Sequence, residues 1–383
     1  MMIKIRLPIV LLLLIVSFNQ SVLASQPGGV ILQYHHIDTL TPAVTSIEPA
    51  QFKRHMDYIA QQGYPVWALE RLVAALISGQ PLPENVVSIT FDDAYPSIYQ
   101  HGFPILKAHG WPFSIFVSTA YIRQQGDDSN FSGDVIVDGG TTDDLADRKI
   151  ANDSQYLSWS QLREMRQAGA SILNHTHSHP HLLRRLSGET RADWEARIGY
   201  QINRAQQLLT EHLGPTPKLL AYPYGEYDKT VAKIATELGY VGVGQQSGAA
   251  GQHDDLSALP RYPLSGIYSD MEGLRLKLNT WPLPLIANGR DPLLHPAENR
   301  PILDLQFSDS NLPLEKLVCY GPNGPTKLTQ LGPQHYQAQS ETPLNVGRSR
   351  YNCTLPVPGS SRFYWFSQLW ILRHPDGSWY AED

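Results

Sequence analysis

Two short motifs bring together the residue types of a metal centre. An apolar run over residues 86–91 ends in two adjacent carboxylates, Asp92 and Asp93. Farther along the chain, His175-Thr-His-Ser-His179 supplies two histidines four positions apart. One carboxylate and two imidazoles form a three-ligand site for a divalent metal ion with an open position, as in catalytic zinc sites. The other carboxylate is then available to accept a proton, so the two motifs together predict a metal ion with a base beside it.

Each motif also has a simpler explanation. Two aspartates after a strand can be a helix N-cap and a turn. The histidines are harder to explain in this way because four of them stand between residues 175 and 181, although a surface cluster can bind metal incidentally. His175 and His179, at positions i and i+4, are predicted to lie on one side of a helical turn that the Thr176 hydroxyl holds. His177 is predicted to point elsewhere.

These motifs follow predicted strands that alternate with predicted helices. We expect strands at 29–37, 64–66, 86–91, 113–117, 171–173, 219–222 and 240–243. We expect helices at 48–62, 68–77, 98–109, 158–168, 192–213 and 229–238. This alternation predicts a parallel α/β sheet or barrel, in which active sites collect at the carboxyl ends of the strands. A third element, Tyr222-Pro-Tyr224-Gly225, also follows a strand; it is either an ordinary turn or a source of an oxyanion-binding amide.

Together the three elements resemble the polysaccharide deacetylase family with the NodB homology domain, carbohydrate esterase family 4. Thr90-Phe-Asp-Asp93 is similar to the first motif of that family, His175-Thr-His-Ser-His179 to the second, and Tyr222-Pro-Tyr224-Gly225 to most of the third. The resemblance covers roughly residues 28–265 and is greatest to the biofilm poly-N-acetylglucosamine deacetylases. It implies an irregular (β/α) barrel of the NodB type.

The resemblance also implies a role for each motif residue. Asp92 is expected to be the general base. Asp93, His175 and His179 are expected to hold a divalent metal ion, usually zinc in this family, which polarises an acetamide carbonyl and acidifies a water molecule. The backbone amide of Tyr224 is expected to stabilise the oxyanion.

The chain departs from the family pattern at two positions. The third motif usually begins with an arginine that orients the base, but this chain has Ala221, and Arg261 is the candidate replacement. No convincing late Leu-x-His motif supplies the general acid. The predicted first strand instead ends in His35, as in the poly-N-acetylglucosamine deacetylases, whose motif order looks circularly permuted. We therefore expect His35 to be the acid, with His36 as the second choice; a purely structural histidine pair is the alternative.

The N-terminus predicts export. Lys4 and Arg6 precede an apolar run at residues 7–18, and Val22-Leu-Ala24 has the small residues of a cleavage site. The run is shorter than the roughly 20 residues that span a bilayer. We expect residues 1–24 to be a signal peptide whose removal leaves no transmembrane anchor and a periplasmic or secreted protein; an uncleaved anchor is the alternative.

The charge balance bears on the partner. The formal charge is −6 at pH 7, and it becomes −8 without Lys4 and Arg6. An acidic balance without a basic footprint argues against nucleic acid and suits a neutral or cationic polymer. The aspartate-rich stretch 127–153 is expected to be either a lining for such a polymer or a solvated loop. The oligomeric state does not follow from the sequence.

After about residue 290 the pattern changes to short alternating strands behind a proline-rich linker. We expect a deacetylase domain at 25–290 and a small β-sandwich at 291–383. The only cysteines of the chain, Cys319 and Cys353, are expected to form a disulfide, as cysteine pairs do in exported proteins. The aromatic residues at 363–366, with Trp370, Trp379 and Tyr380, are expected to form the sandwich core, a sugar-binding surface being the alternative.

The resemblance implies hydrolysis of N-acetyl groups from a polysaccharide that contains N-acetylglucosamine, with release of acetate. Two alternatives stay open. One is a glycan-binding protein on a deacetylase fold that has lost turnover, which the altered arginine and acid positions favour and the complete metal and base set disfavours. The other is a deacetylase of O-acetyl esters or cyclic amides.

Overall fold

The computed structural model describes residues 28–123, 155–286 and 290–381. The expected signal peptide at 1–24 and the aspartate-rich stretch at 127–153 lie outside these ranges. None of the helices in the described ranges is long and apolar enough to cross a membrane.

The N-terminal two thirds of the chain fold around a parallel sheet. Its seven strands lie in the order β8-β7-β6-β5-β4-β1-β9, and every neighbouring pair is parallel. The strands are β1 (Gly29–Tyr34), β4 (Val86–Phe91), β5 (Phe113–Val117), β6 (Ala170–Asn174), β7 (Leu219–Ala221), β8 (Val241–Val243) and β9 (Tyr262–Pro263). The sheet curls into a half-barrel with β8 and β9 at its edges, which confirms the α/β prediction of the NodB type.

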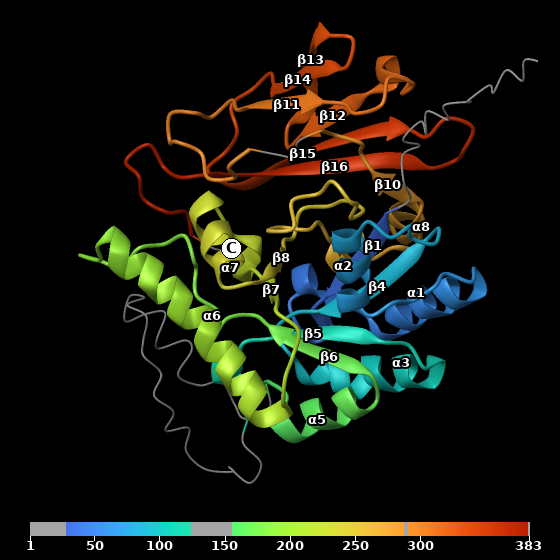
Figure 1. Ribbon diagram of the computed structural model, residues 1–383, viewed down its shortest axis with the longest axis vertical. Coiled ribbons are helices and arrows are strands. Elements are labelled where there is room, and N and C mark those ends of the chain that lie inside the picture. The colour runs from blue at the N-terminus through green and yellow to red at the C-terminus, as the bar shows by residue number, and fades with distance from the viewer. Residues whose placement is uncertain (1–27, 124–154, 287–289, 382–383) are drawn as a thin grey trace, which may run out of the picture.

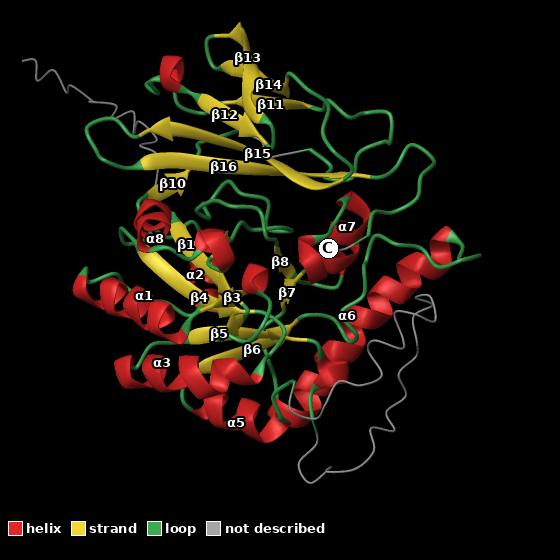
Figure 2. Ribbon diagram, turned by 180° about the vertical axis from the view of Figure 1, so that it is seen from behind, coloured by secondary structure: helices red, strands yellow, loops and turns green. Residues whose placement is uncertain are grey.

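Helices surround this sheet, as Figures 1 and 2 show from opposite sides. They are α1 (Pro49–Gln61), α2 (Leu69–Ser78), α3 (Phe103–His109), α5 (Trp159–Gln167), α6 (Arg191–Leu213), α7 (Lys229–Glu237) and α8 (Met271–Leu278). Short elements complete the layer: β2 (His36–Ile37) paired with β3 (Ser46–Ile47), η1 (Ala43–Thr45), the π-turn η2 (Ile98–Gly102), η3 (Thr119–Tyr121), η4 (Pro223–Gly225) and η5 (Gly266–Tyr268).

Both faces of the parallel strands are buried, so the strands are apolar almost throughout, as expected for a covered parallel sheet. Alternate residues of β1 enter different clusters: Leu32 packs in a cluster that includes Phe52 of α1, whereas Ile31 packs in one that includes Leu72 of α2. The two clusters fix the sheet between its helix layers. The charged and histidine side chains of the predicted site lie just beyond the ends of these strands, whereas the few polar residues inside them, such as Ser88 and Ser114, are buried.

The C-terminal part of the chain, from β10 onward, forms another seven-stranded sheet, drawn above the first in Figure 1. Its order is β10-β16-β15-β12-β13-β14-β11, antiparallel except for β10 and β16. The elements are β10 (Thr280–Pro282), β11 (Ile302–Gln306), η6 (Leu314–Lys316), β12 (Val318–Gly321), β13 (Gly324–Gly332), β14 (His335–Ser340), β15 (Gly347–Pro356) and β16 (Phe363–Leu372).

One hydrophobic cluster collects side chains from both ends of this strand order, including Leu303 of β11 and Trp370 of β16. Because the strands hydrogen-bond in a single continuous order, the expected two-sheet sandwich stays a prediction, and so does the domain boundary at residue 290. Strand β10 precedes that boundary in the chain but pairs with β16.

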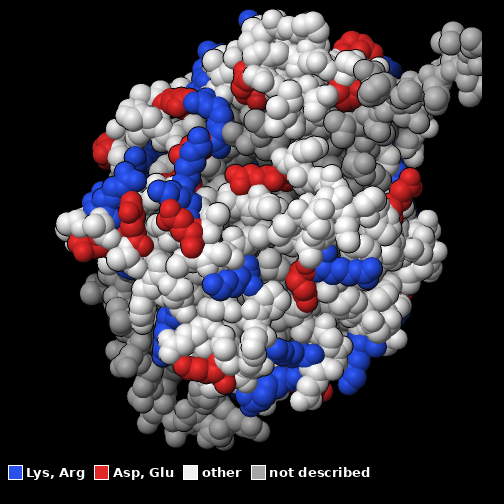
Figure 3. All heavy atoms as spheres, in the orientation of Figure 1, with Lys and Arg blue, Asp and Glu red and all other residues white. Residues whose placement is uncertain are grey.

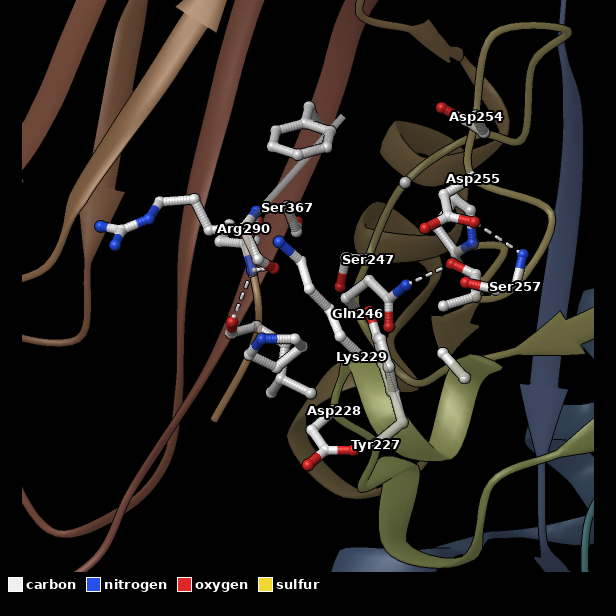
Figure 4. A pocket seen from close by; sticks show the side chains of 18 of the residues that line it. Tyr227, Asp228, Lys229, Gln246, Ser247, Asp254, Asp255, Ser257, Arg290 and Ser367 are labelled. Carbon is white, nitrogen blue, oxygen red and sulfur yellow. Dashed lines mark hydrogen bonds between the residues drawn. The ribbon is translucent and has the colours of Figure 1, made fainter. Parts of the chain in front are cut away.

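A cavity of about 370 Å³ lies between the two sheets, with α7 and the loop that follows β8 on one side and β16 on the other. Figure 4 shows Lys229 and Gln246 on the first side, and Arg290 and Ser367 on the second. None of the predicted metal, base or acid residues lines it. On the face of the molecule that Figure 3 shows, basic and acidic side chains are interspersed.

Cys319 and Cys353 stand opposite each other on β12 and β15 and form a disulfide. The bond closes a loop with a sequence separation of 34 residues. We expect the double variant Cys319→Ala with Cys353→Ala to lose about 4 kcal/mol of unfolding free energy by the chain-entropy relation, measured by denaturant unfolding. A reducing agent should destabilise the wild type and not the variant. Equal stability of the two proteins would show that the bond adds nothing.

Candidate active site

Asp93, His175 and His179 converge at the carboxyl ends of β4 and β6. Asp93 Oδ1 lies 3.4 Å from His175 Nε2 and 3.3 Å from His179 Nε2, and one ligand atom from each residue lies within 4.8 Å of the others. Nitrogen and oxygen ligands at tetrahedral zinc, each about 2.0–2.1 Å from the ion, are about 3.4 Å apart. The carboxylate–imidazole spacings match this value, so the three residues fit a divalent metal ion.

The backbone and a hydrogen bond direct these imidazoles toward Asp93. His175 Nδ1 lies 2.7 Å from the carbonyl oxygen of Ala221, which can only accept, so Nδ1 carries the proton and the Nε2 lone pair faces Asp93. The expected helical turn is wrong: Thr176 and His179 have φ of 67° and 53°, in the left-handed region. The Thr176 hydroxyl does hold this loop, because it accepts from the His179 amide at 3.1 Å.

The neighbouring imidazoles stabilise the ionised form of the Asp93 carboxylate. Burial alone raises the pKa of such a group, but the His179 and His175 imidazoles outweigh it and hold the pKa of Asp93 far below its usual range. Asp93 itself has a left-handed backbone, with φ of 69°. This conformation turns the chain at the end of β4, so that both successive carboxylates lie near the His175 imidazole instead of pointing to opposite sides of a strand.

Asp92 is completely buried and is held by Arg261. The guanidinium donates from Nη1 to Oδ1 at 2.7 Å and from Nη2 to Oδ2 at 2.8 Å, and Gln33 Nε2 donates to Oδ2 at 2.7 Å. Burial alone raises the pKa of Asp92, but the guanidinium outweighs it and lowers the pKa to about 2. Asp92 is therefore anionic and fixed in orientation, and Arg261 occupies the place beside it that the sequence left open at Ala221.

The two candidate acids take different positions. His35 Nε2 lies 3.9 Å from Asp92 Oδ2, and 15% of the His35 side chain is exposed. The His36 ring instead stacks on Tyr95 at a centroid distance of 3.6 Å, and burial lowers the pKa of His36 to about 4. Of the pair, His35 is thus the one that the structure brings to the predicted base.

Tyr224 lies beside the metal-ligand cluster. It follows β7 in the short helical turn η4 and has a left-handed backbone, with φ of 58°. Its ring meets the His179 ring edge-on at 4.5 Å. The third motif therefore lies against the second, as the resemblance implies.

Sequence reasoning missed several residues around this site. Gln33 lies on β1, two positions before His35, and no sequence pattern assigns it a role in the site. Glu226 directly follows the third motif, and its Oε2 lies 2.9 Å from His181 Nδ1. The nearness of Glu226 to the third motif was the only signal that could have found it. Arg348, which donates to the carbonyl oxygen of Tyr224, comes from β15, and no local pattern places that strand here.

A family model described as polysaccharide deacetylase matches residues 79–243, the segment that contains the metal-ligand cluster and the third motif. The chain therefore contains a polysaccharide deacetylase domain. This confirms the resemblance inferred from the three motifs. The enzymes of this family are hydrolases of carbon–nitrogen bonds other than peptide bonds.

Curated proteins are similar in sequence to part of this chain. It is 25% identical over 248 residues to the poly-β-1,6-N-acetyl-D-glucosamine N-deacetylase of Escherichia coli (strain K12), over 58% of this chain and 35% of that protein. It is also 25% identical over 236 residues to the putative polysaccharide deacetylase YxkH of Bacillus subtilis (strain 168), over 61% of this chain and 71% of that one. The chain therefore spans about a third of the length of the E. coli relative.

Two solved structures share its fold. The Streptococcus pyogenes deacetylase PplD, in complex with acetate, aligns with a TM-score of 0.52 and 24% identity, over 66% of this chain and 99% of that one. A de-N-acetylase from Aggregatibacter actinomycetemcomitans aligns with a TM-score of 0.52 and 18% identity, over 65% of this chain and 99% of that one. These likenesses support the NodB-type fold for about two thirds of the polysaccharide deacetylase described here.

The buried ion pair gives a stability prediction. We expect Arg261→Met to lower the free energy of unfolding by about 3–5 kcal/mol because it leaves the Asp92 carboxylate buried without its cation. Denaturant unfolding monitored by circular dichroism measures the change. The double variant Arg261→Met with Asp92→Asn should recover much of the loss, since neither charge remains. A loss below about 1 kcal/mol in the single variant would contradict the assigned pairing.

Proposed function

We propose that this chain is an exported, metal-dependent N-deacetylase that removes acetyl groups from a polymer of N-acetylated amino sugars. The observation that carries the proposal is the pairing of a buried, anionic Asp92 with the ligand cluster of Asp93, His175 and His179. A base, a metal site and a histidine acid close to one another are the requirements of hydrolytic amide cleavage.

Asp93, His175 and His179 would hold the metal ion, for which we propose zinc. When bound, such an ion supplies Lewis acidity to the acetamide carbonyl and to a water molecule. Asp92 takes the proton from the water that attacks the carbonyl carbon. Arg261 and Gln33 keep the carboxylate ionised and oriented for that transfer.

The remaining steps belong to Tyr224 and His35. As the water oxygen bonds to carbon, negative charge develops on the carbonyl oxygen, and the Tyr224 amide donates a hydrogen bond to it. The carbon–nitrogen bond then breaks, and His35 delivers a proton to the departing amine. The products are acetate and a free amino group on the sugar.

The names of the relatives support a particular substrate class. The E. coli protein is named a poly-β-1,6-N-acetyl-D-glucosamine N-deacetylase, and so is a Staphylococcus aureus (strain MRSA252) protein that is 24% identical over 181 residues. We propose the same class of polymer for this chain. Export is supported by the disulfide between Cys319 and Cys353, because such bonds persist in oxidising compartments.

Acetate release tests this function. Zinc-loaded protein should release acetate from β-1,6-linked N-acetylglucosamine oligomers and more slowly from β-1,4-linked oligomers of equal length. O-acetylated oligomers without N-acetyl groups serve as the comparison substrate. Turnover of the esters alone would replace the amide by an ester as the substrate. Tight oligomer binding without any acetate release would make the chain a glycan-binding protein and overturn the proposal.

A further inference from the structure

The second sheet reaches into the active site through Arg348. This residue lies near the start of β15, and its Nη1 donates to the carbonyl oxygen of Tyr224 at 2.5 Å. The guanidinium carbon also lies 5.9 Å from the centre of the Tyr224 ring. One arginine of the C-terminal sheet thus contacts both the backbone and the ring of the residue that carries the proposed oxyanion donor.

Tyr380, near the C-terminus, makes a second connection to the same loop. Its hydroxyl donates to Glu226 Oε1 at 2.6 Å, and Glu226 has no exposed surface. The other oxygen of Glu226 lies 2.9 Å from His181 Nδ1, and the His181 ring stacks on Tyr224 at 3.9 Å with an interplanar angle of 8°. A continuous set of contacts therefore joins Tyr380 to Tyr224.

The C-terminal segment that carries Tyr380 is itself held in place by packing contacts. Two guanidinium groups lie within cation–π range of the Trp379 ring, that of Arg184 at 5.6 Å and that of Arg373 at 5.4 Å from its centre. Tyr380 is buried and belongs to a hydrophobic cluster that also contains Leu182, only three positions after His179. The segment is consequently packed against the chain that follows the second motif.

The backbone of Tyr224 explains why such contacts are needed. Its φ of 58° lies in the left-handed region, which a residue with a side chain adopts only where surrounding contacts impose it. An oxyanion donor works only within a few tenths of an ångström of the right place, because its benefit depends on the geometry at the developing charge. The loop from Tyr222 to Glu226 therefore requires support from outside itself.

We propose that Arg348 and Tyr380 are positioning residues of the catalytic centre, which hold the loop from Tyr222 to Glu226 so that the Tyr224 amide faces the reacting carbonyl. The inference rests on the proposed deacetylase function, and it gives the C-terminal sheet a role in the chemical step rather than in binding the polymer. Neither residue touches the substrate in this account; both act through Tyr224.

Hydrogen exchange tests the support without any reference to activity. In Arg348→Met and Tyr380→Phe, the amides of Tyr222, Tyr224, Gly225 and Glu226 should exchange about tenfold faster than in the wild type, because the loop opens locally. Arg348→Lys should keep most of the protection, since lysine can also donate to the Tyr224 carbonyl. Arg362→Met is the matched control. Arg362, just before β16, also joins the two sheet regions, because its Nη2 lies 3.8 Å from Glu84, just before β4, but it does not contact the loop. Unchanged exchange in the first two variants would overturn the proposal.

Steady-state kinetics on N-acetylglucosamine oligomers tests the catalytic consequence. Arg348→Met and Tyr380→Phe should lower kcat about tenfold and leave KM within about twofold, because only an interaction made in the transition state is lost. Arg362→Met should match the wild type. A raised KM with unchanged kcat would assign the two residues to substrate binding and overturn the positioning role. If the wild type releases no acetate, the proposed function fails, and the exchange result alone decides whether the loop is held.

Discussion

Asp92→Asn is expected to lower kcat for acetate release by about 10²–10⁴-fold, the usual contribution of a positioned general base. Asparagine has nearly the same shape and keeps an oxygen that can accept from Arg261, but it cannot take a proton from water. Because Asp92 is not among the three converging ligands, zinc affinity should stay close to that of the wild type. Kinetics and a competitive zinc titration on the same protein measure the two quantities.

The matched control is Asp57→Asn, which removes an exposed carboxylate on α1 that pairs with Lys53. Its kcat should stay within about twofold of the wild type, since surface ion pairs contribute little. Circular dichroism must show that Asp92→Asn is folded at the assay temperature, because the change leaves the Arg261 guanidinium without its anion. A folded, zinc-loaded Asp92→Asn protein with wild-type turnover would remove Asp92 from the role of base.

Asp93→Asn should have the opposite profile and lose the metal. Replacing an anionic ligand by a neutral amide removes the charge that attracts the cation, and we expect zinc affinity to fall by more than about 10²-fold, beyond the loss typical of a residue that only supports a ligand. Competition with a chelating dye measures the affinity. Acetate release should be lost at limiting zinc and should return in part at excess zinc.

Asp92→Asn is the natural comparison for this variant, because the two changes are chemically identical and one residue apart. The assigned roles require different results for the two variants: Asp92→Asn should retain the ion without turnover, and Asp93→Asn should fail to hold it. Wild-type zinc affinity in Asp93→Asn would contradict the assignment of Asp93 as a ligand.

The parallel sheet could be predicted because burial on both faces leaves a strong sequence signal. Strands β1, β4 and β5 are apolar runs that end in polar residues, and the helices between them show a periodic apolar face. The expected helix over 98–109 is interrupted: it begins as a π-turn, η2, and continues as α3. Pro104 lacks an amide hydrogen and so cannot complete a regular α-helical ladder at that point.

The identity of the metal ligands could be predicted, but their backbone could not. The spacing of His175 and His179 suggested a helical turn, whereas the loop is left-handed at Thr176 and His179. Side chains from elsewhere impose this conformation; Gln201 of α6, for example, accepts from the Ser178 amide at 2.9 Å. Such tertiary contacts carry no local pattern.

The role of Arg261 could be predicted in part from the sequence, whereas that of Arg348 could not. Arg261 was nominated only because an arginine was missing at Ala221, and its arrival at Asp92 depends on β9 pairing with β1, which no local pattern reveals. The contact of Arg348 with Tyr224 depends on how the second sheet lies against the first. The expectation of a core role for the aromatic residues holds for Tyr364 and Trp370, which are buried in the core of that sheet. It does not hold for Phe363, which is 36% exposed, or for Trp379 and Tyr380, which pack in a cluster with residues of the first sheet.

The most direct test of metal-dependent deacetylation with Asp92 as the base is a zinc titration. Acetate release and bound zinc are measured together in wild-type and Asp92→Asn protein. Both proteins are first stripped with a chelator and then titrated in the presence of β-1,6-linked N-acetylglucosamine oligomers. We expect wild-type activity to rise with zinc and to level off at one ion per chain, while Asp92→Asn binds the same single ion and releases almost no acetate. Acetate release that survives chelation, or a zinc-loaded wild type that releases none, would contradict this mechanism.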